Sequence, residues 1–424
     1  MMRKGIILAL MVGLVATACG GGGGEKKSTT TSKKVEVFSW WTAGGEAQAL
    51  DALVKVLNQK YPNFSFDNAA VAGGGGSAAR AVLATRLSAN KPPASWQSHA
   101  GQEVLSNYAD AGELQSLNSL FQQQGWTSVM PKGLIDLLTE NGTIYAVPVN
   151  IHRANVIWYN SAVLQKNGVD VPTTWDAFFA AAAKLKAAGV TPLGLGNADK
   201  FAVKQLLETI LLATLGPDKY AGLWNGSTDW NGSDVTTAIG TFARALTYAN
   251  SDYSSLTWDQ AAGLVAKGDA AFTVMGDWAE GFFKAQGLKP NADFGWAASP
   301  GTDGVFDMLA DVFVLPKNSP NQAGTMAWLT VAGSKEGQDA FNPIKGSIPA
   351  RTDADPGKYD EYQKWSLDQW KTDTIVGSLA HGAAASSSWS TDIDTALGLF
   401  LTNNDKAGFQ KALAQACVDA GKCS

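Results

Sequence analysis

Short runs of β-branched and aromatic residues alternate with longer amphipathic stretches from residue 35 onward. The runs have the length of strands, and the amphipathic stretches have the apolar periodicity of helices. A glycine-rich loop at residues 73–76 separates the second strand from the second helix. The predicted elements in this part of the chain are strands at 35–41, 64–66 and 94–98, and helices at 44–60 and 77–90. This β-α-β-α order predicts a mostly parallel sheet covered by helices, with ligands meeting the loops at the carboxyl ends of the strands.

The same pattern continues through the rest of the chain, with longer helices. Strands flank Pro148, which marks a plausible crossing from a first lobe to a second. Strands are predicted at 144–149, 154–160, 270–275 and 308–315, and helices at 175–188, 200–215, 233–248, 258–267, 320–331 and 335–342. A chain of 424 residues exceeds what one hydrophobic core organises, so we expect two lobes and more than one crossing between them.

The N-terminus has the pattern of a targeting segment. Arg3 and Lys4 precede an apolar run from Gly5 to Val15 that is too short to span a bilayer. The following Ala16-Thr17-Ala18-Cys19 resembles a bacterial lipobox, which predicts a signal peptide at 1–18 and lipidation of Cys19. Residues 19–34 are rich in glycine, serine and lysine and read as a flexible tether. Ordinary signal cleavage and a short buried apolar stretch are the alternatives.

Composition narrows the classes of partner and ligand. A formal net charge of -5, with 17% charged residues, gives no sign of binding to nucleic acid or to an anionic membrane surface. The count of 15 tryptophans is high, and an indole offers a broad apolar face. Cys417 and Cys423 are predicted to form a disulfide, with two free thiols as the alternative. No histidine lies near them, so a metal site is not expected, and the glycine loop lacks the Gly-Lys-Ser/Thr of a phosphate-binding loop.

Three stretches carry a more specific pattern. They are Ile157-Trp158-Tyr159-Asn160, residues 171–178 with the sequence VPTTWDAF, and residues 184–193 with the sequence KLKAAGVTPL. Together they resemble the YN…P.TW.EF…A.KLKAAG.TPL signature of the family 1 extracellular solute-binding proteins, the carbohydrate-binding components of ABC importers. Gly276-Asp277-Trp278 and the segment 342–351 extend the likeness over nearly the whole mature chain.

Within that family the chain most resembles the glucose/galactose/mannose-binding group. The resemblance rests on Trp40 to Glu46, Gln97-Ser98-His99, Lys345-Gly346 and His381-Gly382. It implies an α/β, two-lobed periplasmic-binding-protein fold of type II-like topology, with a mostly parallel sheet in each lobe and a ligand cleft between the lobes. The implied N-terminal lobe is 35–150 plus about 309–345, and the C-terminal lobe is 151–308 plus about 346–424.

The resemblance also implies a function. We expect a periplasmic or cell-surface lipoprotein, anchored to the membrane only through Cys19, that captures a monosaccharide by hinge closure and passes it to ABC permease subunits. A monomer without cofactor or metal is expected. A disaccharide or an oligosaccharide is the alternative ligand.

The chemistry of a hexose indicates which side chains to seek. Its C–H face needs flat aromatics, and its hydroxyl rim needs fixed polar groups. Trp40, Trp41 and Trp278 are the aromatic candidates, with a role in the core as the alternative and Trp258 as a further candidate. The polar candidates are Glu46, Gln97, His99, Asp311, Lys345 and His381.

Each polar candidate also has a structural explanation. Glu46 suits a helix N-terminus, and Gln97 and His99 could cap or pack. Lys345 is expected in a loop between Pro343 and Gly346, and Asp311 in an apolar strand, where it needs a partner. The third histidine, His152, lies near the predicted crossing.

Two other classes of protein fit less well. A glycoside hydrolase needs two carboxyl groups about 5 to 9 Å apart across the scissile bond, and the sequence offers no obvious pair. An adhesin or scaffold does not explain why polar and aromatic candidates fall at strand ends. We therefore expect a binding protein and no enzyme.

Overall fold

The computed structural model describes residues 33–42, 44–198 and 200–424. The predicted signal peptide, Cys19 and residues 20–32 of the predicted tether lie outside the described residues. In the described part of the chain, no helix is long and apolar enough to cross a membrane.

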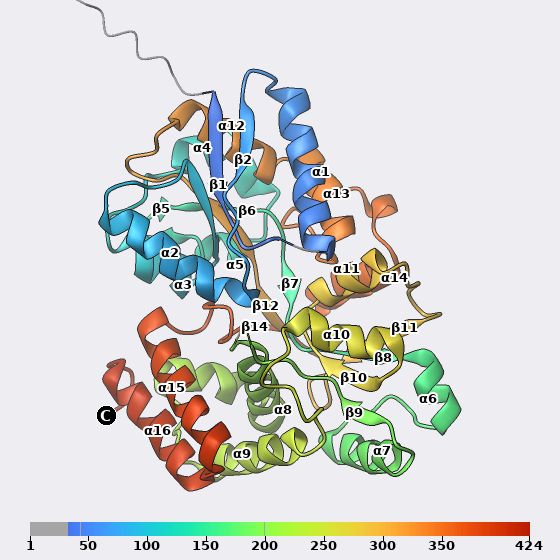
Figure 1. The fold of residues 1–424 in the computed structure, drawn as a ribbon. Coiled ribbons are helices and arrows are strands. Elements are labelled where there is room, and N and C mark those ends of the chain that lie inside the picture. Colours follow the sequence, from blue (N-terminus) through green and yellow to red (C-terminus); the bar gives the residue numbers. More distant parts are fainter. Residues whose placement is uncertain (1–32, 43, 199) are drawn as a thin grey trace, which may run out of the picture. The chain divides into compact units, whose positions relative to one another are not determined.

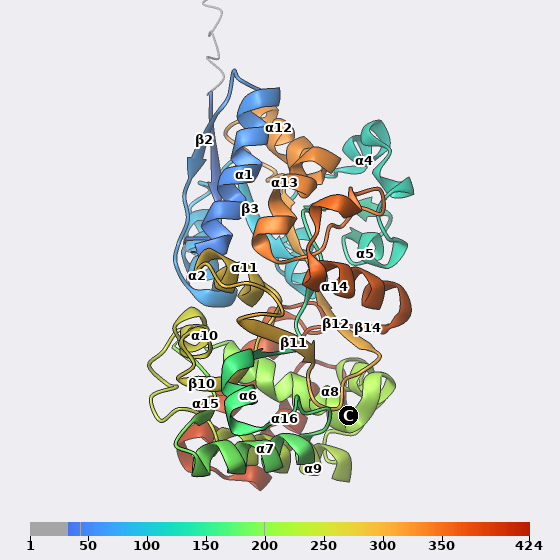
Figure 2. The same ribbon diagram turned by 90° about the vertical axis from the view of Figure 1, so that its right-hand side faces the viewer.

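The first sheet has five strands in the order β2-β1-β3-β13-β6. β1 runs parallel to β2 and β3, whereas β13 runs antiparallel to β3 and β6. The strands are β1 (Lys34–Phe38), β2 (Ser65–Asn68), β3 (Ser95–His99), β6 (Ala146–Pro148) and β13 (Asp311–Val314). Around them lie α1 (Gly44–Lys60), α2 (Ser77–Ser88), α3 (Gln102–Val104), α4 (Asn118–Gln124), α5 (Lys132–Asp136), the hairpin β4 (Thr139–Glu140) and β5 (Thr143–Ile144), α12 (Gln322–Gly333) and α13 (Lys335–Lys345). Figures 1 and 2 show α1 and α13 side by side over this sheet.

The second sheet has four strands in the order β11-β8-β10-β9. β8 pairs antiparallel with β10 and β11, and β10 pairs parallel with β9. The strands are β8 (Val156–Asn160), β9 (Thr191–Leu193), β10 (Ala270–Val274) and β11 (Phe294–Ala298). The helices packed with them are α6 (Ser161–Asn167), α7 (Trp175–Ala187), α8 (Ala202–Asn225), α9 (Ser233–Leu246), α10 (Trp258–Lys267), α11 (Trp278–Ala285), α14 (Glu361–Thr372), α15 (Ser387–Asn403) and α16 (Lys406–Asp419).

A small third sheet, in the order β14-β12-β7, lies between the other two (Figure 1). Its strands are β7 (His152–Arg153), β12 (Val305–Leu309) and β14 (Thr374–Gly377). We call it the crossover sheet, because the buried apolar residues form two clusters and the chain passes between them here. One cluster, the N-terminal lobe, gathers around the first sheet, and the other, the C-terminal lobe, around the second.

Several predicted elements differ from the structure. The sheets are mixed instead of mostly parallel, because the segments that return from the other lobe enter antiparallel to their neighbours. The strand predicted at 308–315 is two strands, β12 and β13, which belong to different sheets and are separated at Ala310. The helix predicted to end at Leu215 continues to Asn225 with a kink at Gly216, whose φ of 74° is left-handed. Helices α14, α15 and α16 were not predicted.

Local signals explain why the predicted helices begin where they do. The Thr174 side chain accepts from the backbone N–H of Ala177 at the start of α7. α10 begins with a reciprocal capping box between Thr257 and Gln260. Such caps satisfy backbone donors that the helix itself leaves free. In the last turn of α16, Cys417 is joined by a disulfide to Cys423, with a Cα–Cα distance of 5.3 Å.

Candidate functional site

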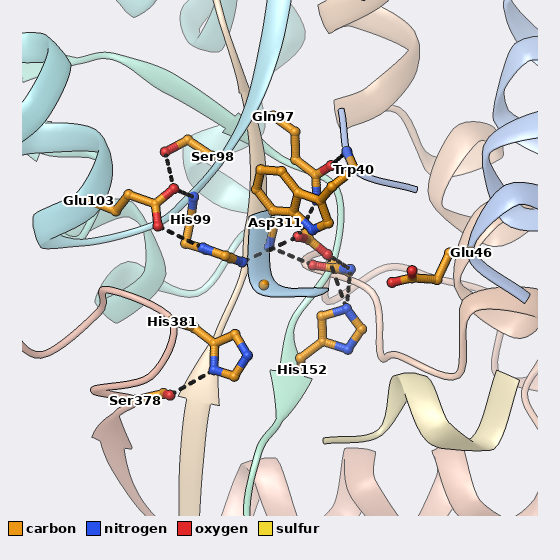
Figure 3. Close-up of polar contacts among 12 residues, drawn as sticks. Trp40, Glu46, Gln97, Ser98, His99, Glu103, His152, Asp311, Ser378 and His381 are labelled. Atoms are coloured by element: carbon orange, nitrogen blue, oxygen red, sulfur yellow. Dashed lines mark hydrogen bonds and ion pairs between the residues drawn. The ribbon is translucent and has the colours of Figure 1, made fainter. Parts of the chain in front are cut away.

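A partly open cavity lies where the two lobes meet the crossover sheet. All the predicted ligand-binding residues except Gln97 line it, as do the weaker candidates His152 and Trp258. The lining residues that sequence reasoning missed are Gly75, Phe201 and Leu309. All three histidines of the chain meet at this cavity, although they are far apart in sequence (Figure 3).

Asp311 is the anionic centre of the cavity wall. It opens β13, and its Oδ1 accepts from Gln97 Nε2 at 2.8 Å. Its Oδ2 accepts from Asn150 Nδ2 at 2.8 Å and from His152 Nε2 at 3.0 Å. Burial alone would raise the pKa of this carboxyl, but hydrogen bonding and charge from His152 and the charge of Lys345 hold the pKa well below its usual range. Asp311 is therefore a fixed carboxylate at any ordinary pH.

Gln97 supports the site from outside the cavity. While its Nε2 donates to Asp311, its Oε1 accepts from the backbone N–H of Trp40 at 3.3 Å. From β3, the side chain thus links Trp40, just after β1, to Asp311 at the start of β13. Among the described residues, Gln97 positions the groups that it bonds to. Its direct contact with a ligand stays a prediction.

His152 bridges carboxylates from both lobes. Its Nδ1 bonds to Asp277, which precedes α11, while its Nε2 bonds to Asp311 in β13. Burial lowers the pKa of this imidazole, but the charge of Asp277 and the two hydrogen bonds outweigh burial and raise the pKa overall. Through these two contacts His152 joins the lobes at the cavity.

His99 is oriented by a second buried carboxylate. Its Nδ1 lies 2.9 Å from Oε2 of Glu103, which also forms an ion pair with Arg80 at 3.1 Å. Burial opposes ionisation of Glu103, but the charges of His99 and Arg80 and the hydrogen bonds from His99 and Ser98 lower its pKa to about 2. An ionised Glu103 accepts the Nδ1 proton, which leaves the Nε2 edge of His99 facing Asp311 Oδ1 at 3.8 Å.

His381 has the opposite electrostatic setting. Its Nδ1 lies 3.0 Å from Ser378 Oγ, and its ring packs edge-on against Trp278 and Phe201. Burial, together with the charges of His99 and His152, lowers its pKa well below the usual range. His381 is therefore neutral, and its ring contributes both a flat surface and a hydrogen-bonding edge to the cavity.

The aromatic side chains at the cavity are positioned by glycines. The Trp40 ring lies so close to Gly76 that a Cβ there would come within 2.7 Å of it. A Cβ at Gly276 would lie 2.1 Å from the Trp278 ring, which explains the glycine in Gly276-Asp277-Trp278. Trp41 is fully buried and packs on Phe313 and Phe341 in the core, so it touches the cavity from within the N-terminal lobe.

Lys345 was expected in a loop and is instead the last residue of α13. Pro343 does not end the helix; Gly346 does, with a left-handed φ of 93°. The Lys345 ammonium pairs with Glu46 at 2.7 Å and lies 5.6 Å from the centre of the Trp41 ring. Glu46 is at the start of α1, so this ion pair joins two helix termini at the cavity.

The arrangement is suited to binding a neutral polar molecule. Fixed donors and acceptors surround a space walled by indoles, the composition expected of a small-molecule site. Asp311 is held ionised and so is not poised as a general acid for glycoside cleavage. Among the described residues, no group of histidine, cysteine, aspartate and glutamate has the arrangement of a metal site.

Comparison with known proteins decides the family. Residues 43–339 match the model of the bacterial extracellular solute-binding protein family. The chain belongs to this family. An ABC transporter extracellular-binding protein of Pyrococcus horikoshii is 40% identical to this solute-binding protein over 379 residues, which are 88% of this chain and 84% of the relative. A probable sugar-binding periplasmic protein of Mesorhizobium japonicum is 36% identical, covering 83% of this chain and 85% of its own length.

The solved structures agree on the fold. The bacterial solute receptor AcbH, described with an exclusive preference for β-D-galactopyranose, matches with a TM-score of 0.79 at 18% identity, over 92% of this chain and 98% of the receptor. The predicted two-lobed α/β periplasmic-binding-protein fold is therefore confirmed.

Proposed function

We propose that this solute-binding protein captures a single hexose of the glucose, galactose or mannose type and delivers it to the permease subunits of an ABC importer. The observation that carries the proposal is the cavity itself, on whose walls indoles and fixed polar groups from distant parts of the chain come together. The probable sugar-binding relative and the ABC-transporter relative support the class of ligand and the type of partner.

The polar groups supply both kinds of hydrogen bond that a sugar hydroxyl needs. Asp311 and the Nε2 edges of His99 and His381 face the same space, and the Lys345 ammonium lies beside Trp41 and Trp278. A hydroxyl both donates and accepts, so a site that offers carboxylate, imidazole and ammonium groups satisfies several hydroxyls at once. The indole faces of Trp40 and Trp278 suit the C–H face of a pyranose ring.

Contacts between the lobes beside the cavity favour capture by closure. On one side, the backbone N–H of Glu103 donates to Gly382 O at 2.9 Å. On the other, α1 approaches α11 so closely that a Cβ at Gly45 would lie 2.6 Å from Gly281 O. A ligand held between such surfaces stabilises the closed state in proportion to its extra contacts there.

The proposal includes the cell-surface or periplasmic location and the lipid anchor. Extracellular family membership supports the location. The targeting pattern and the residues before Cys19 support cleavage after residue 18 and lipidation of Cys19. The protein is proposed to work as a monomer that docks on its permease. Mass spectrometry of the membrane-extracted protein tests the anchor: a diacylglyceryl-modified Cys19 at the N-terminus is expected, and an unmodified N-terminus contradicts it.

Isothermal titration calorimetry tests the ligand directly. Glucose, galactose, mannose, xylose, maltose and trehalose are titrated into the purified protein at one buffer and temperature. One-to-one binding of a hexose, tighter by at least tenfold than binding of maltose or trehalose, is expected. Binding of the disaccharides alone contradicts the monosaccharide assignment, and failure of every sugar contradicts the sugar class.

A disaccharide is the second candidate, and a specific feature favours it. A second, roomier cavity adjoins the first and shares Trp40, Glu46, Trp258 and Trp278 with it. Phe282, Thr42 and Asp259 add aromatic and polar surface to its walls. Phe282→Ala separates the two candidates: it weakens a disaccharide by about tenfold and leaves a hexose within about twofold.

A further inference from the structure

Two buried carboxyl groups lie behind the cavity and do not line it. Glu208 is in α8 and Asp307 is in β12, and both side chains are fully buried. Burial raises the pKa of Glu208 to about 7, and burial with the neighbouring Glu208 raises the pKa of Asp307 well above its usual range. Within the described part of the chain, neither carboxyl oxygen of Asp307 has an ordinary hydrogen-bond donor. These observations fit a pair of acids that share a proton.

One serine, Ser378, links the Glu208 carboxyl group to His381 at the cavity. Its Oε1 accepts from Ser378 Oγ at 2.9 Å, and its Oε2, which lies 3.2 Å from the same hydroxyl, accepts from the backbone N–H of Ala380 at 2.8 Å. A hydroxyl has only one proton, and Ser378 donates it to the carboxyl group. The Ser378 oxygen therefore faces His381 Nδ1, 3.0 Å away, as an acceptor.

This chain of donors and acceptors determines which nitrogen of His381 carries the proton. The ring is neutral, so a proton on Nδ1 that is donated to Ser378 leaves a lone pair on Nε2. Among the described residues Nε2 meets no hydrogen-bond partner, while the ring itself lines the cavity and packs on Phe201 and Trp278. Figure 3 shows His381 and its contact with Ser378.

We propose that Glu208, acting through Ser378, is a positioning residue that fixes His381 as the Nδ1–H tautomer, so that Nε2 serves as a hydrogen-bond acceptor for a ligand hydroxyl. Glu208 thereby sets the direction of a hydrogen bond at the C-terminal lobe without touching the ligand. The acceptor role rests on the proposed sugar binding, whereas the tautomer is a property of the free protein.

The electrostatic surroundings of the pair are consistent with this role. The charged or titratable groups that act on Glu208 and Asp307 come from several elements. All of them leave the Glu208 oxygen that faces Ser378 able to accept a hydrogen bond. They are Lys204 and Tyr220 on α8, Arg153 on β7, and His381 beyond Ser378. Whichever acid holds the shared proton, Glu208 still presents an oxygen to Ser378 and to Ala380.

Nuclear magnetic resonance of ¹⁵N-histidine-labelled protein without ligand reads the tautomer directly. The chain has only three histidines, and His381→Gln identifies the signals of His381. The expected result is a protonated Nδ1 and an unprotonated Nε2 near neutral pH. A proton on Nε2 in the unaltered protein overturns the proposal, whatever the protein binds.

Glu208→Gln is the decisive variant because it keeps the shape and reverses one hydrogen bond. Its oxygen can still accept from Ala380, so its amide nitrogen donates to Ser378, whose hydroxyl proton then turns to His381 Nδ1. The tautomer should flip to Nε2–H, and the affinity for the hexose should fall by about tenfold or more. An unchanged tautomer in a folded Glu208→Gln protein overturns the proposal.

Asp307→Asn is the matched control, since it alters the same buried pair but not the link to Ser378. Its His381 should keep the Nδ1–H tautomer; a flip like that of Glu208→Gln contradicts the route through Ser378. If Glu208→Gln does not fold, two variants of Ser378 test the same link. Ser378→Thr should keep the Nδ1–H tautomer of His381, and in Ser378→Ala this tautomer should no longer predominate. A tautomer that behaves as expected in a protein that binds no sugar would contradict the proposed function while leaving the positioning role intact.

Discussion

The two lobes build opposite kinds of wall around one cavity. The N-terminal wall, which comprises Glu46, His99, Asp311 and Lys345 with Trp40 and Trp41, carries most of the ionisable groups. The C-terminal wall, which comprises Phe201, Trp258, Trp278 and His381, is aromatic and has the neutral His381 as its polar residue. His152, on the crossover sheet, links the two through Asp311 and Asp277.

The two walls differ in how far their groups are fixed before a ligand binds. Asp311 takes hydrogen bonds from Gln97, Asn150 and His152 before any ligand arrives, so the N-terminal wall is preorganised and charged. Preorganised groups lose little conformational entropy on binding. The C-terminal wall offers mainly aromatic surface, which contributes to affinity when the lobes close on a ligand. We therefore expect changes in the N-terminal wall to have the larger effects on affinity.

The largest effect is expected from Asp311→Asn. The amide would place a donor among the donors of Gln97, Asn150 and His152, and it would remove the charge that balances His152 and Lys345. Breaking a buried charged hydrogen-bond network of this kind costs on the order of 4 kcal/mol, which is a loss of roughly 1,000-fold in affinity. Calorimetry with the tightest hexose measures it.

Asp368→Asn is the control for Asp311→Asn. Asp368 is exposed, and its carboxylate forms an ion pair with the exposed Lys371, so its replacement should leave affinity and melting temperature unchanged. An affinity of Asp311→Asn within tenfold of the unaltered protein contradicts the central role assigned to the N-terminal wall.

The second prediction uses pH to distinguish the stability contributions of the two walls. Glu103 orients His99 in the N-terminal wall, and His381 belongs to the C-terminal wall. The pKa of Glu103 is lowered from 4.5 to about 2, so its stabilising effect is present above pH 4.5 and is lost as the pH falls from 4.5 toward 2. By linkage this is worth about 3 kcal/mol at neutral pH. Glu103→Gln should therefore lower the free energy of unfolding by about that amount at pH 7 and by little at pH 2.

The C-terminal wall should respond to acid in a different range. The pKa of His381 is lowered from 6.5, so the unfolded chain takes up this proton first and stability falls as the pH drops below 6.5. In urea titrations across pH, His381→Gln should flatten the profile just below pH 6.5, and Glu103→Gln should flatten it only below pH 4.5. Identical profiles for the two variants would remove the electrostatic contrast between the walls.

The sequence predicted local elements such as single helices well, and it predicted the pairing of strands that are distant in sequence poorly. α7 and α10 have clear caps, and the predicted bounds of α1, α7 and α10 nearly match the structure. The antiparallel entry of β13 could not be predicted, because it depends on a pairing with β3 more than 200 residues away in sequence. The apolar run that contains β12 and β13 gave no signal that it changes sheets at Ala310.

The candidate site was predicted because its chemistry is rare in this chain. The three histidines, with Trp40, Trp41 and Trp278, were few enough to single out, and the structure brings them together at the cavity. Phe201 was missed because an aromatic residue before a long apolar helix has the pattern of a core residue. Glu208 gave no signal either, since only its distance from Ser378 and Ala380 in the folded chain makes it notable.

The smallest effect is expected from Trp278→Phe in the C-terminal wall. Phenylalanine keeps an aromatic face beside His381 and Phe201 but removes part of the surface against His152 and Lys345. Loss of part of one stacking contact costs about 1 kcal/mol, so the hexose affinity should fall roughly fivefold by calorimetry. Trp296→Phe is the matched control, because that indole packs on Tyr362 away from the cavity and its replacement should leave the affinity unchanged. A loss from Trp278→Phe that exceeds the loss from Asp311→Asn would reverse the comparison and make the aromatic wall the main source of affinity.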